Sequence, residues 1–304
     1  MADTEVRVGQ RQLKLSNLDK VLYPFTGFTK AEVIDYYARI SEAMVAHTSG
    51  RCVTLRRWPD GVEGQSFFEK NCPKHRPDWV ETAVGPGRSR GEVNYCRLDE
   101  PAALVWTANL AALELHTPMA LADDQANPRA CVFDLDPGPR TGIPQCAELA
   151  LEIRSILAAA DLDCFAKTSG SKGMQVYVPL NSTGEDAHSH DHCADFAHAV
   201  GALLEQRHPR GVTTDMAKDQ RPGKVFVDWS QNAFHKTTVC VYSLRAKPQP
   251  TVSTPLRWNE VAAGANGAEP LVFEAPDVLA RVAAHGDLFA SVLGLVQHLP
   301  TARG

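Results

Sequence analysis

The stretch Cys131–Pro139, CVFDLDPGP, sets two aspartates on either side of a leucine and then ends in Pro-Gly-Pro. Successive side chains of an extended strand point to opposite faces, so Asp134 and Asp136 share one face while Phe133 and Leu135 share the other. The apolar face can pack into a core. The other face presents two carboxylates about 7 Å apart, since a strand rises roughly 3.3 Å per residue. Neighbouring like charges repel, so this spacing favours a bound divalent metal ion.

Strand and helix signals follow this stretch in a regular order. The first strand, 131–136, precedes a helix whose apolar residues recur at helical spacing, and a second such helix comes later. Their apolar stripes comprise Cys146, Leu149, Ile153, Ile156 and Leu157, and Cys193, Phe196, Ala197, Val200, Leu203 and Leu204. The other strands are expected at 163–167, 174–180 and 224–230. The order β-α-β-β-α-β predicts a split-βαβ arrangement.

In the usual strand order of that motif the fourth strand lies beside the first. Asp228 on the fourth strand could then stand next to Asp134 and Asp136. Three carboxylates suit hard cations such as Mg²⁺ or Mn²⁺ rather than zinc. Two such ions can activate an attacking hydroxyl and stabilise a leaving phosphate oxygen. The sequence therefore predicts a metal site at this strand pair.

Two polar stretches accompany the aspartates. Thr168–Gly173, TSGSKG, offers backbone N–H groups, hydroxyls and a lysine to an anion, although an ordinary hairpin turn would use the same residues. Residues 217–247 carry six Lys or Arg against two Asp. Cations in this stretch could neutralise a triphosphate, and a solvated basic face is the alternative interpretation.

The overall composition is that of a soluble globular chain. The 304 residues are 44% hydrophobic and 22% charged, with a net charge of −5, which argues mildly against a general nucleic-acid binder. We find neither an apolar run of membrane-spanning length nor a signal peptide, so we expect no membrane partner and a cytoplasmic location. The eight cysteines contain no C-x-x-C pair, and we expect reduced thiols. The stretch 188–193, HSHDHC, is interpreted as a solvated loop rather than a transition-metal site.

The remaining segments give shorter signals. TKAE, Thr29–Glu32, is typical of a capping box and predicts a helix from about Lys30 to Ala46. Residues 102–115 look helical and run into His116. Strand-like runs at 52–58, 65–70 and 92–98 include SFFEK, where one of two adjacent phenylalanines must face away from the core. Residues 248–255 are interpreted as a surface linker, and 276–299 as one or two closing helices.

Together these motifs resemble the polymerase domain of bacterial DNA ligase D, in the archaeo-eukaryotic primase superfamily. The resemblance is carried by VFDLDPGP, TSGSKG, GKVFVDWSQN followed by KTT, and YSLR, and nearer the N-terminus by NLDKVLYP, TLRRWPDG, FFEK and ALELHTP. It runs from about Lys14 to Asp287. Several motifs in one order make it far more specific than any single motif.

The resemblance implies an α+β primase-polymerase fold. It implies a single domain over 1–304, with an N-terminal α/β lobe at about 11–125, a split βαββαβ (RRM-like) catalytic module at 126–248, and a C-terminal wrap and helices at 249–304. The implied enzyme is a nucleotidyltransferase, a template-directed DNA/RNA polymerase. It would add ribo- or deoxyribonucleotides to a primer 3′-hydroxyl with two Mn²⁺ or Mg²⁺ ions, filling short gaps or ends in DNA repair.

The resemblance also implies roles for individual residues. The catalytic metal ligands would be Asp134, Asp136 and Asp228, and the triphosphate or sugar would contact His116, Ser169, Lys172, Gln231 and Arg245. The incoming base would lie by Arg56 and by Phe67 or Phe68. A downstream 5′-phosphate would be gripped by Lys20 and Lys30, while Arg221 and Lys224 match a flexible basic loop.

The sequence departs from the family pattern in places. Arg56 stands where lysine is familiar, and QNAFHKTT replaces the usual small-residue turn before KTT. No ligase or nuclease module accompanies the motifs, so we expect either a stand-alone relative or part of a larger protein. Implied partners are gapped or broken DNA with a 5′-phosphate, nucleoside triphosphates, and a Ku-type end-binding protein or a DNA ligase. The implied location is the cytoplasm, associated with the nucleoid.

Two rival functions remain at this point. A nucleotide cyclase or another metal-dependent phosphotransferase could use the same scaffold and paired aspartates without DNA. A non-catalytic 5′-phosphate end-binding module would bind DNA equally well after Asp134→Ala. The intact aspartate set disfavours the binding module, and the matches at Lys20, Lys30 and Phe68 disfavour the cyclase.

Overall fold

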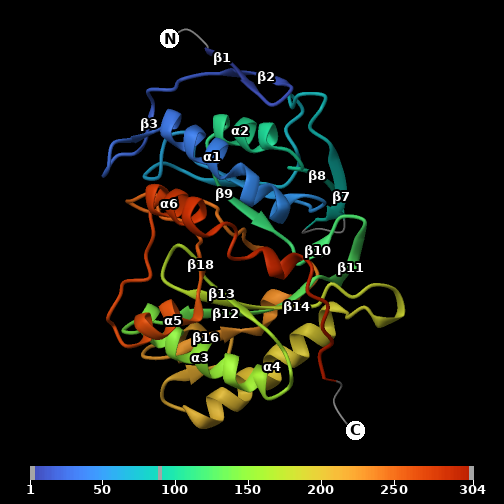
Figure 1. The fold of residues 1–304 in the computed structure, drawn as a ribbon, viewed down its shortest axis with the longest axis vertical. Coiled ribbons are helices and arrows are strands. Elements are labelled where there is room, and N and C mark those ends of the chain that lie inside the picture. The colour runs from blue at the N-terminus through green and yellow to red at the C-terminus, as the bar shows by residue number, and fades with distance from the viewer. Residues whose placement is uncertain (1–3, 88–90, 301–304) are drawn as a thin grey trace. The chain divides into compact units, whose positions relative to one another are not determined.

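The computed structural model describes residues 4–87 and 91–300, and it is a mixed α and β protein (Figure 1). Contacts divide the chain into two compact units. Unit 1 comprises the chain up to Pro118 together with Thr237–Ser253 and Phe273–Asp287. Unit 2 comprises Met119–Lys236, Thr254–Val272 and the chain from Leu288 on.

Unit 1 contains a four-stranded sheet of order β17-β9-β5-β6, in which all neighbours are antiparallel. Its strands are β5 (Thr54–Arg57), β6 (Phe67–Glu69), β9 (Ala112–Thr117) and β17 (Thr238–Val239). Three two-stranded sheets accompany it: β1 (Thr4–Val8) with β2 (Arg11–Leu15), β3 (Val21–Tyr23) with β4 (Phe28–Thr29), and β7 (Thr82–Pro86) with β8 (Glu92–Cys96). The helices are α1 (Lys30–Thr48), α2 (Pro101–Asn109) and α6 (Ala275–His285), and α1 packs on both others.

Helix α1 confirms the predicted capping box. The Thr29 hydroxyl accepts a hydrogen bond from the Glu32 N–H, and the Glu32 carboxylate accepts one from the Thr29 N–H at 2.7 Å. Two orphan donors of the first turn are thereby satisfied. The helix ends at Thr48, two residues beyond the expected end.

The helix expected over 102–115 is wrong in its second half. Helix α2 ends at Asn109, Ala111 has a φ of 56°, and 112–117 form strand β9. A left-handed residue breaks the helical path, and β9 then pairs with β5 on one side and β17 on the other. This pairing, which joins segments far apart in the chain, overrides the local helix preference of alanine and leucine.

Unit 2 is built on a six-stranded sheet of order β15-β16-β12-β14-β13-β18. The strands are β12 (Ala130–Pro137), β13 (Phe165–Thr168), β14 (Met174–Pro179), β15 (Val212–Thr213), β16 (Val225–Asp228) and β18 (Pro255–Leu256), with a separate hairpin of β10 (Ala120–Leu121) and β11 (Asp124–Pro128). The helices are α3 (Ile143–Ala158), α4 (His190–Arg207) and α5 (Trp258–Ala265). Short 3₁₀ turns lie at Gly184–Asp186, Lys218–Gln220, Trp229–Asn232 and Ala290–Leu293.

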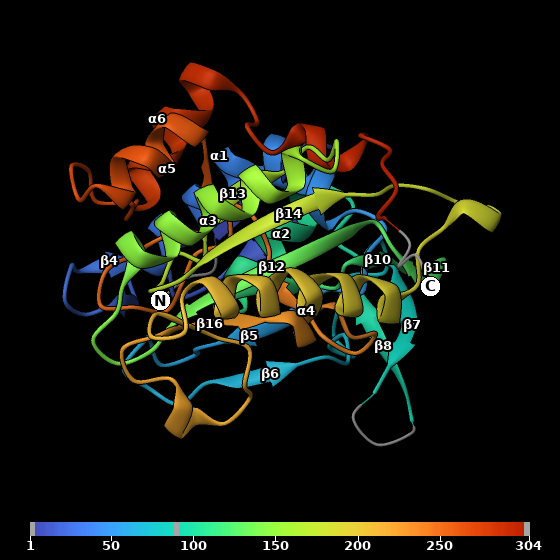
Figure 2. The ribbon, with the colours of Figure 1, turned by 90° about the horizontal axis from the view of Figure 1, so that it is seen from below.

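Strand β12 lies inside this sheet, between β14 and β16, as the sequence predicted for the first and fourth strands. Its apolar side chains Phe133 and Leu135 are fully buried. Helices α3 and α4 contact each other and β12, and both run alongside the strands in Figure 2. They cover the apolar face of β12, which explains the alternation that opens the sequence.

Two further expectations are corrected. Cys72 and Cys96 form a disulfide, so not all thiols are reduced; the Cys72 N–H already donates to the Asn94 carbonyl oxygen, which brings the two cysteines together. The other six cysteines are free and buried. The segment 248–255 is no surface linker, because Val252 and Ser253 are fully buried.

The histidine-rich stretch 188–193 is not a solvated loop. His188 and His190 are 8% and 7% exposed, and α4 begins at His190 behind the N-cap Ser189. Both ring nitrogens of His190 meet carbonyl oxygens, those of Asn232 and Gln125. Backbone partners therefore allow burial of side chains whose polarity suggested exposure.

Within 4–87 and 91–300, the structure contains no helix that is long and apolar enough to cross a membrane.

Candidate active site

The aspartates of unit 2 meet across two neighbouring strands. Asp134 of β12 lies directly opposite Asp228 of β16 in the antiparallel register, and Asp136 follows two residues along, opposite Phe226. Both paired aspartates are only 8% exposed. Burial, followed by the charge of Asp136 and that of Asp228, raises the pKa of Asp134 to about 7.

Amides and a hydroxyl already engage these carboxylates. Gln175 on β14 donates to Asp134 at 3.1 Å, and Asp228 accepts from the Ser230 N–H and hydroxyl at 3.1 and 2.6 Å. Gln231 donates to the second Asp228 oxygen at 3.4 Å, which brings a predicted nucleotide contact to the aspartate pair. In the described part of the chain, no three His, Cys, Asp or Glu side chains already converge as a metal would need.

The loop Thr168–Gly173 lies against the end of β12. A Cβ on Gly173 would stand 2.5 Å from the Leu135 carbonyl oxygen and 3.4 Å from the Asp136 carboxylate. The Ser169 hydroxyl accepts from the N–H groups of Ser171 and Gly173, and Lys172 donates to the Pro137 carbonyl oxygen at 3.2 Å. The loop therefore lies beside Asp136, and Lys172 reaches the end of β12.

Backbone hydrogen bonds join the Pro-Gly-Pro at the end of β12 to the basic loop that precedes β16, residues 216–224. The Gly138 N–H donates to the Lys224 carbonyl oxygen at 2.9 Å, and the Gly223 N–H donates to the Pro139 carbonyl oxygen at 2.7 Å. A Cβ on Gly138 would overlap the carbonyl oxygen of Arg221, so only glycine fits this close approach. The Arg221 guanidinium stacks 3.7 Å above the Phe226 ring.

Unit 1 holds a second cluster, centred on a carboxylate that sequence reasoning missed. Glu114 of β9 is 1% exposed and accepts hydrogen bonds from Arg245 at 3.0 Å, the Ala246 N–H at 3.2 Å and Arg56 at 3.5 Å. The His116 Nε2 atom lies 3.1 Å from Glu114 Oε2, the oxygen that Arg56 also contacts. Glu114 thus gathers three of the predicted nucleotide-binding residues, from β5, β9 and the segment after β17.

The available sequence signal for Glu114 was its place in ALELHTP. A lone carboxylate between leucines is expected to pair with cations when the stretch is a buried strand. The helical interpretation of 102–115 concealed this pattern, because a helix would have spread Glu114 and His116 onto different faces.

The cations around Glu114 outweigh the effect of its burial. Burial alone would raise the pKa of Glu114, but hydrogen bonds and charges from His116 and Arg245 lower it to about 2. The pKa of His116 is lowered by burial and by the positive charges of Arg245 and Arg56, while Glu114 opposes that shift. The cluster therefore keeps Glu114 ionised at neutral pH.

The adjacent side chains of Phe67 and Phe68 on β6 lie on opposite faces of the sheet. Phe68 packs edge-on against His116 with ring centroids 5.7 Å apart, and Arg56 lies 4.9 Å over the Phe68 ring. Phe67 instead lies under Arg57 at 5.3 Å. Of the two candidates that the sequence left open, only Phe68 shares a face with His116.

Lys20 and Lys30, the two lysines predicted to bind a 5′-phosphate, lie next to each other in unit 1. The Lys30 N–H donates to the Lys20 carbonyl oxygen at 2.8 Å. The Lys30 ammonium donates to the Ser16 carbonyl oxygen at 2.6 Å, and the Lys20 ammonium pairs with Asp60 at 2.9 Å. Burial, then the charges of Lys20 and Arg57, lower the pKa of Lys30 to about 8.

Comparison with known proteins places these clusters in context. The sequence model of the LigD primase-polymerase domain matches residues 29–289. The multifunctional non-homologous end joining protein LigD of Mycolicibacterium smegmatis is 42% identical over 281 residues, which are 92% of this chain and 36% of that protein. The bifunctional non-homologous end joining protein LigD of Bacillus subtilis is 29% identical over 275 residues, 90% of this chain and 43% of that protein.

A solved structure gives the same similarity in three dimensions. It is described as the polymerase domain from Mycobacterium tuberculosis Ligase D in complex with DNA, and it matches with a TM-score of 0.84 and 41% identity. The match covers 92% of this chain and 98% of that one. The chain thus spans nearly all of a polymerase domain but little more than a third of the mycobacterial LigD protein.

Proposed function

Since the chain belongs to the LigD primase-polymerase domain family, we propose that it is a template-directed polymerase that fills short gaps or ends during non-homologous end joining. Family membership makes it a nucleotidyltransferase. We propose that it adds ribo- or deoxyribonucleotides to a primer 3′-hydroxyl. The observation that carries the proposal is the pairing of Asp134 with Asp228 across β12 and β16, with Asp136 two residues away.

We infer that unit 2 holds the catalytic module, a split βαββαβ of RRM type. The strand order β16-β12-β14-β13, with α3 and α4 as the two connecting helices, supports this inference. Unit 1 then supplies the N-terminal α/β lobe, and the two units together form one primase-polymerase domain.

The reaction of this family is expected to use divalent metal ions, and the residues present fit such ions. Asp134, Asp136 and Asp228 offer the oxygen donors that Mg²⁺ and Mn²⁺ prefer. Burial and the neighbouring carboxylates raise the pKa of Asp134, and a bound cation would stabilise its ionised form. We propose that these three aspartates hold two ions, Mn²⁺ or Mg²⁺, after small side-chain movements. When bound, the ions would activate the 3′-hydroxyl and stabilise the departing pyrophosphate.

The chain's own residues then position the reactants. The primer 3′-oxygen forms a bond to the α-phosphorus of the nucleoside triphosphate, while the bond from that phosphorus to pyrophosphate breaks. Lys172 would bind phosphate oxygens, and Ser169 and Gln231 would orient the triphosphate or sugar. Holding these groups in line is most of what such catalysis requires.

We propose nucleotide contacts for the Glu114 cluster of unit 1 as well. His116 and Arg245 would meet the triphosphate or sugar, while Phe68 and Arg56 would flank the base. The Arg56 guanidinium lies over the Phe68 ring, so a nucleobase could stack on this planar pair. Phe67, on the opposite face, would stay outside this contact.

We propose that Lys20 and Lys30 bind a 5′-phosphate of gapped or broken DNA, and that Arg221 and Lys224 contact the DNA near the active site. Such contacts would supply affinity and register without reading sequence. The proposed partners are nucleoside triphosphates, DNA ends, and a Ku-type protein or a DNA ligase. A DNA-repair role would associate the protein with the nucleoid.

The test is primer extension on a duplex with a short gap, with and without a downstream 5′-phosphate, in Mn²⁺ with ribo- or deoxyribonucleotides. Asp134→Ala/Asp136→Ala is compared with Asp195→Asn, an exposed aspartate on α4. Template-dependent addition lost only in the double variant is expected. Equal binding of gapped DNA by both proteins without any addition would instead indicate an end-binding module.

A further inference from the structure

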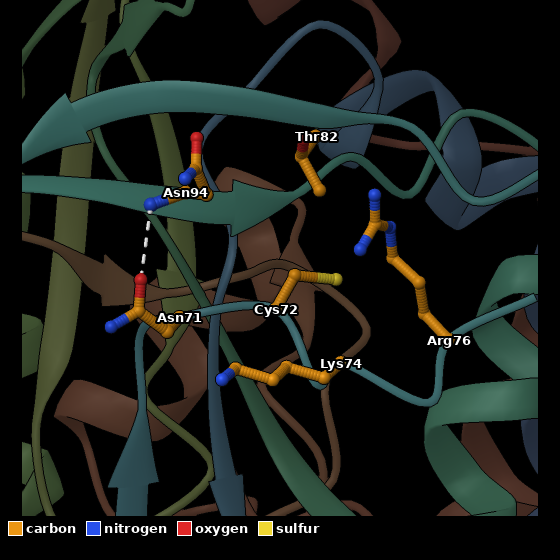
Figure 3. A pocket seen from close by; sticks show the side chains of 6 residues that line it. All are labelled: Asn71, Cys72, Lys74, Arg76, Thr82 and Asn94. Carbon is orange, nitrogen blue, oxygen red and sulfur yellow. Dashed lines mark hydrogen bonds between the residues drawn. The ribbon is translucent and has the colours of Figure 1, made fainter. Parts of the chain in front are cut away.

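Unit 1 has a hollow that none of the proposed contacts uses. It is a cavity of about 410 Å³ between the segment 71–76 and the β7–β8 hairpin (Figure 3). Six of the residues that the structure describes line it: Asn71, Cys72, Lys74, Arg76, Thr82 and Asn94. This volume exceeds that of a phosphate group, and the lining combines two cations with amide and hydroxyl groups.

The charge of the hollow favours an anion. None of the six lining side chains is acidic. The nearest acidic neighbour in sequence, Glu81, pairs with Arg97 at 3.8 Å. A hydrogen bond from Arg76 Nε to the Val80 carbonyl oxygen, at 3.0 Å, fixes the orientation of the guanidinium. The terminal N–H groups of Arg76 can then bind a ligand. Lys74 and Arg76 both line the hollow; in Figure 3 the Arg76 guanidinium points towards Thr82, and the Lys74 side chain extends below Cys72 towards Asn71.

The walls of the hollow are joined before any ligand binds. The Asn71 side chain accepts from the Asn94 N–H at 3.1 Å, and the Cys72 N–H donates to the Asn94 carbonyl oxygen at 2.6 Å. The disulfide between Cys72 and Cys96 adds a covalent link between the segment 71–76 and β8. A preformed site loses less entropy on binding than one that must fold around its ligand.

The hollow also lies next to an aromatic strand. Asn71 follows Phe68 by three residues, a stretch of chain that spans at most about 10 Å. Phe67 and Phe68 are 45% and 56% exposed. Cationic sites beside exposed aromatic rings are the combination with which proteins bind single-stranded nucleic acid.

We propose that this hollow binds a backbone phosphate of single-stranded DNA, namely the template overhang that extends from the copied end. The proposal rests on the proposed polymerase function and deepens it, because it assigns a path to the template strand. Lys74 and Arg76 neutralise the phosphate, while Asn71, Asn94 and Thr82 supply neutral hydrogen-bonding partners. The hollow contributes affinity and no sequence preference.

Fluorescence polarisation with two labelled duplexes tests the proposal. One carries a 5′ overhang of about ten nucleotides, within the range that single-strand sites cover, and the other an overhang of about one nucleotide. Lys74→Ala/Arg76→Ala is compared with Arg7→Ala/Arg39→Ala, which removes two cations from β1 and α1 outside the hollow. Circular dichroism and thermal melting verify that both variants fold.

Lys74→Ala/Arg76→Ala should weaken binding of the long overhang about tenfold and that of the short one less than twofold. The slope of log affinity against log salt should fall by about 0.7 for each phosphate that the variant no longer neutralises. The control should bind both duplexes like the wild-type protein. Equal weakening on both duplexes, or none on the long one, overturns the proposal. Primer extension by the wild-type protein on the same duplexes distinguishes failure of this template-site proposal from failure of the proposed polymerase function. If the polymerase function failed, every duplex would stay unextended.

Discussion

Two buried carboxylates, one in each unit, have pKa values that are shifted in opposite directions. Glu114 lies among Arg245, His116 and Arg56, and its pKa falls to about 2. Asp134 is buried beside Asp136 and Asp228, and its burial and their charges raise its pKa to about 7 despite the Gln175 hydrogen bond. Both side chains sit on β-strands and are almost fully buried. The chain neutralises Glu114 with its own cations, whereas balancing the charge of the aspartates requires something that binds.

The largest expected effect comes from removing one charge of the aspartate set. Asp134→Asn should lower nucleotide addition about a thousandfold or more, because losing several kcal/mol of metal-based transition-state stabilisation has that effect. The same variant should be more stable than wild type at pH 8 in chelator, by up to about 4 kcal/mol, because a buried negative charge and its repulsion by Asp136 and Asp228 disappear. Single-turnover extension and urea unfolding measure the two effects.

Asp195→Asn on the exposed face of α4 is the matched control. It should change neither rate nor stability appreciably, since exposed substitutions stay within about 0.5 kcal/mol. If Asp134→Asn destabilised the metal-free protein, ionised Asp134 would stabilise the fold as Glu114 does, and the proposed difference between the two carboxylates would be wrong.

Glu114→Gln should show the reverse pattern. Leaving Arg245 and Arg56 without their buried anion should lower the free energy of unfolding by about 3–5 kcal/mol. The apparent KM for the nucleotide should rise, because the cations lose their orientation, while Mn²⁺ binding should be retained. Urea unfolding and extension kinetics measure these effects, with Glu42→Gln on the exposed side of α1 as the control. A variant as stable as wild type would show that Glu114 does not organise the cluster.

The pH dependence of stability sharpens the comparison. Glu114, with an ordinary pKa of 4.5 lowered to about 2, contributes stability above pH 4.5 that is lost as the pH falls towards 2. Asp134, with an ordinary pKa of 3.8 raised to about 7, favours the native state at low pH; this contribution is lost as the pH rises from about 4 to 7, where only the unfolded chain has released the proton.

Urea unfolding in chelator from pH 2 to 8 should therefore show a loss at the acid end that Glu114→Gln lacks. It should also show a decline between about pH 4 and 7 that Asp134→Asn lacks. Identical curves for wild type and either variant would refute the corresponding assignment.

A smaller effect is expected at the exit of β12. Gly138→Ala places a Cβ against the Arg221 carbonyl oxygen, so the basic loop must move, at a cost of about 1–3 kcal/mol. Hydrogen exchange should become faster across residues 216–224. Gly211→Ala is the control, because the nearest atoms to its added Cβ lie 4.0 Å away. Unchanged exchange in Gly138→Ala would show that Pro-Gly-Pro does not hold this loop.

The same contrast explains what the sequence could predict. The aspartate pair follows from local rules: alternation put Asp134 and Asp136 on one face, and the strand order of a familiar motif put Asp228 opposite. The turn between β13 and β14 and the capping box of α1 are likewise local patterns. Each was predicted because its physical cause lies within a few neighbouring residues.

Glu114 could not be found in this way. Its partners come from β5 and from the segment after β17, 58 and 131 residues away in the chain. No local rule reports such pairing, and the alanine- and leucine-rich context favoured a helix. The Cys72–Cys96 disulfide and the buried His190 were missed for the same reason, since partners distant in sequence decide both.

Mn²⁺ titration of the metal-free protein, followed by water-proton relaxation, tests the central claim most directly. Wild type, Asp134→Asn, Glu114→Gln and Asp195→Asn are compared at one pH. If the aspartates form the catalytic metal site, Asp134→Asn binds Mn²⁺ at least about tenfold more weakly, one charged ligand being worth more than 1.4 kcal/mol, while the other variants bind like wild type. Unchanged Mn²⁺ binding by Asp134→Asn would contradict the account.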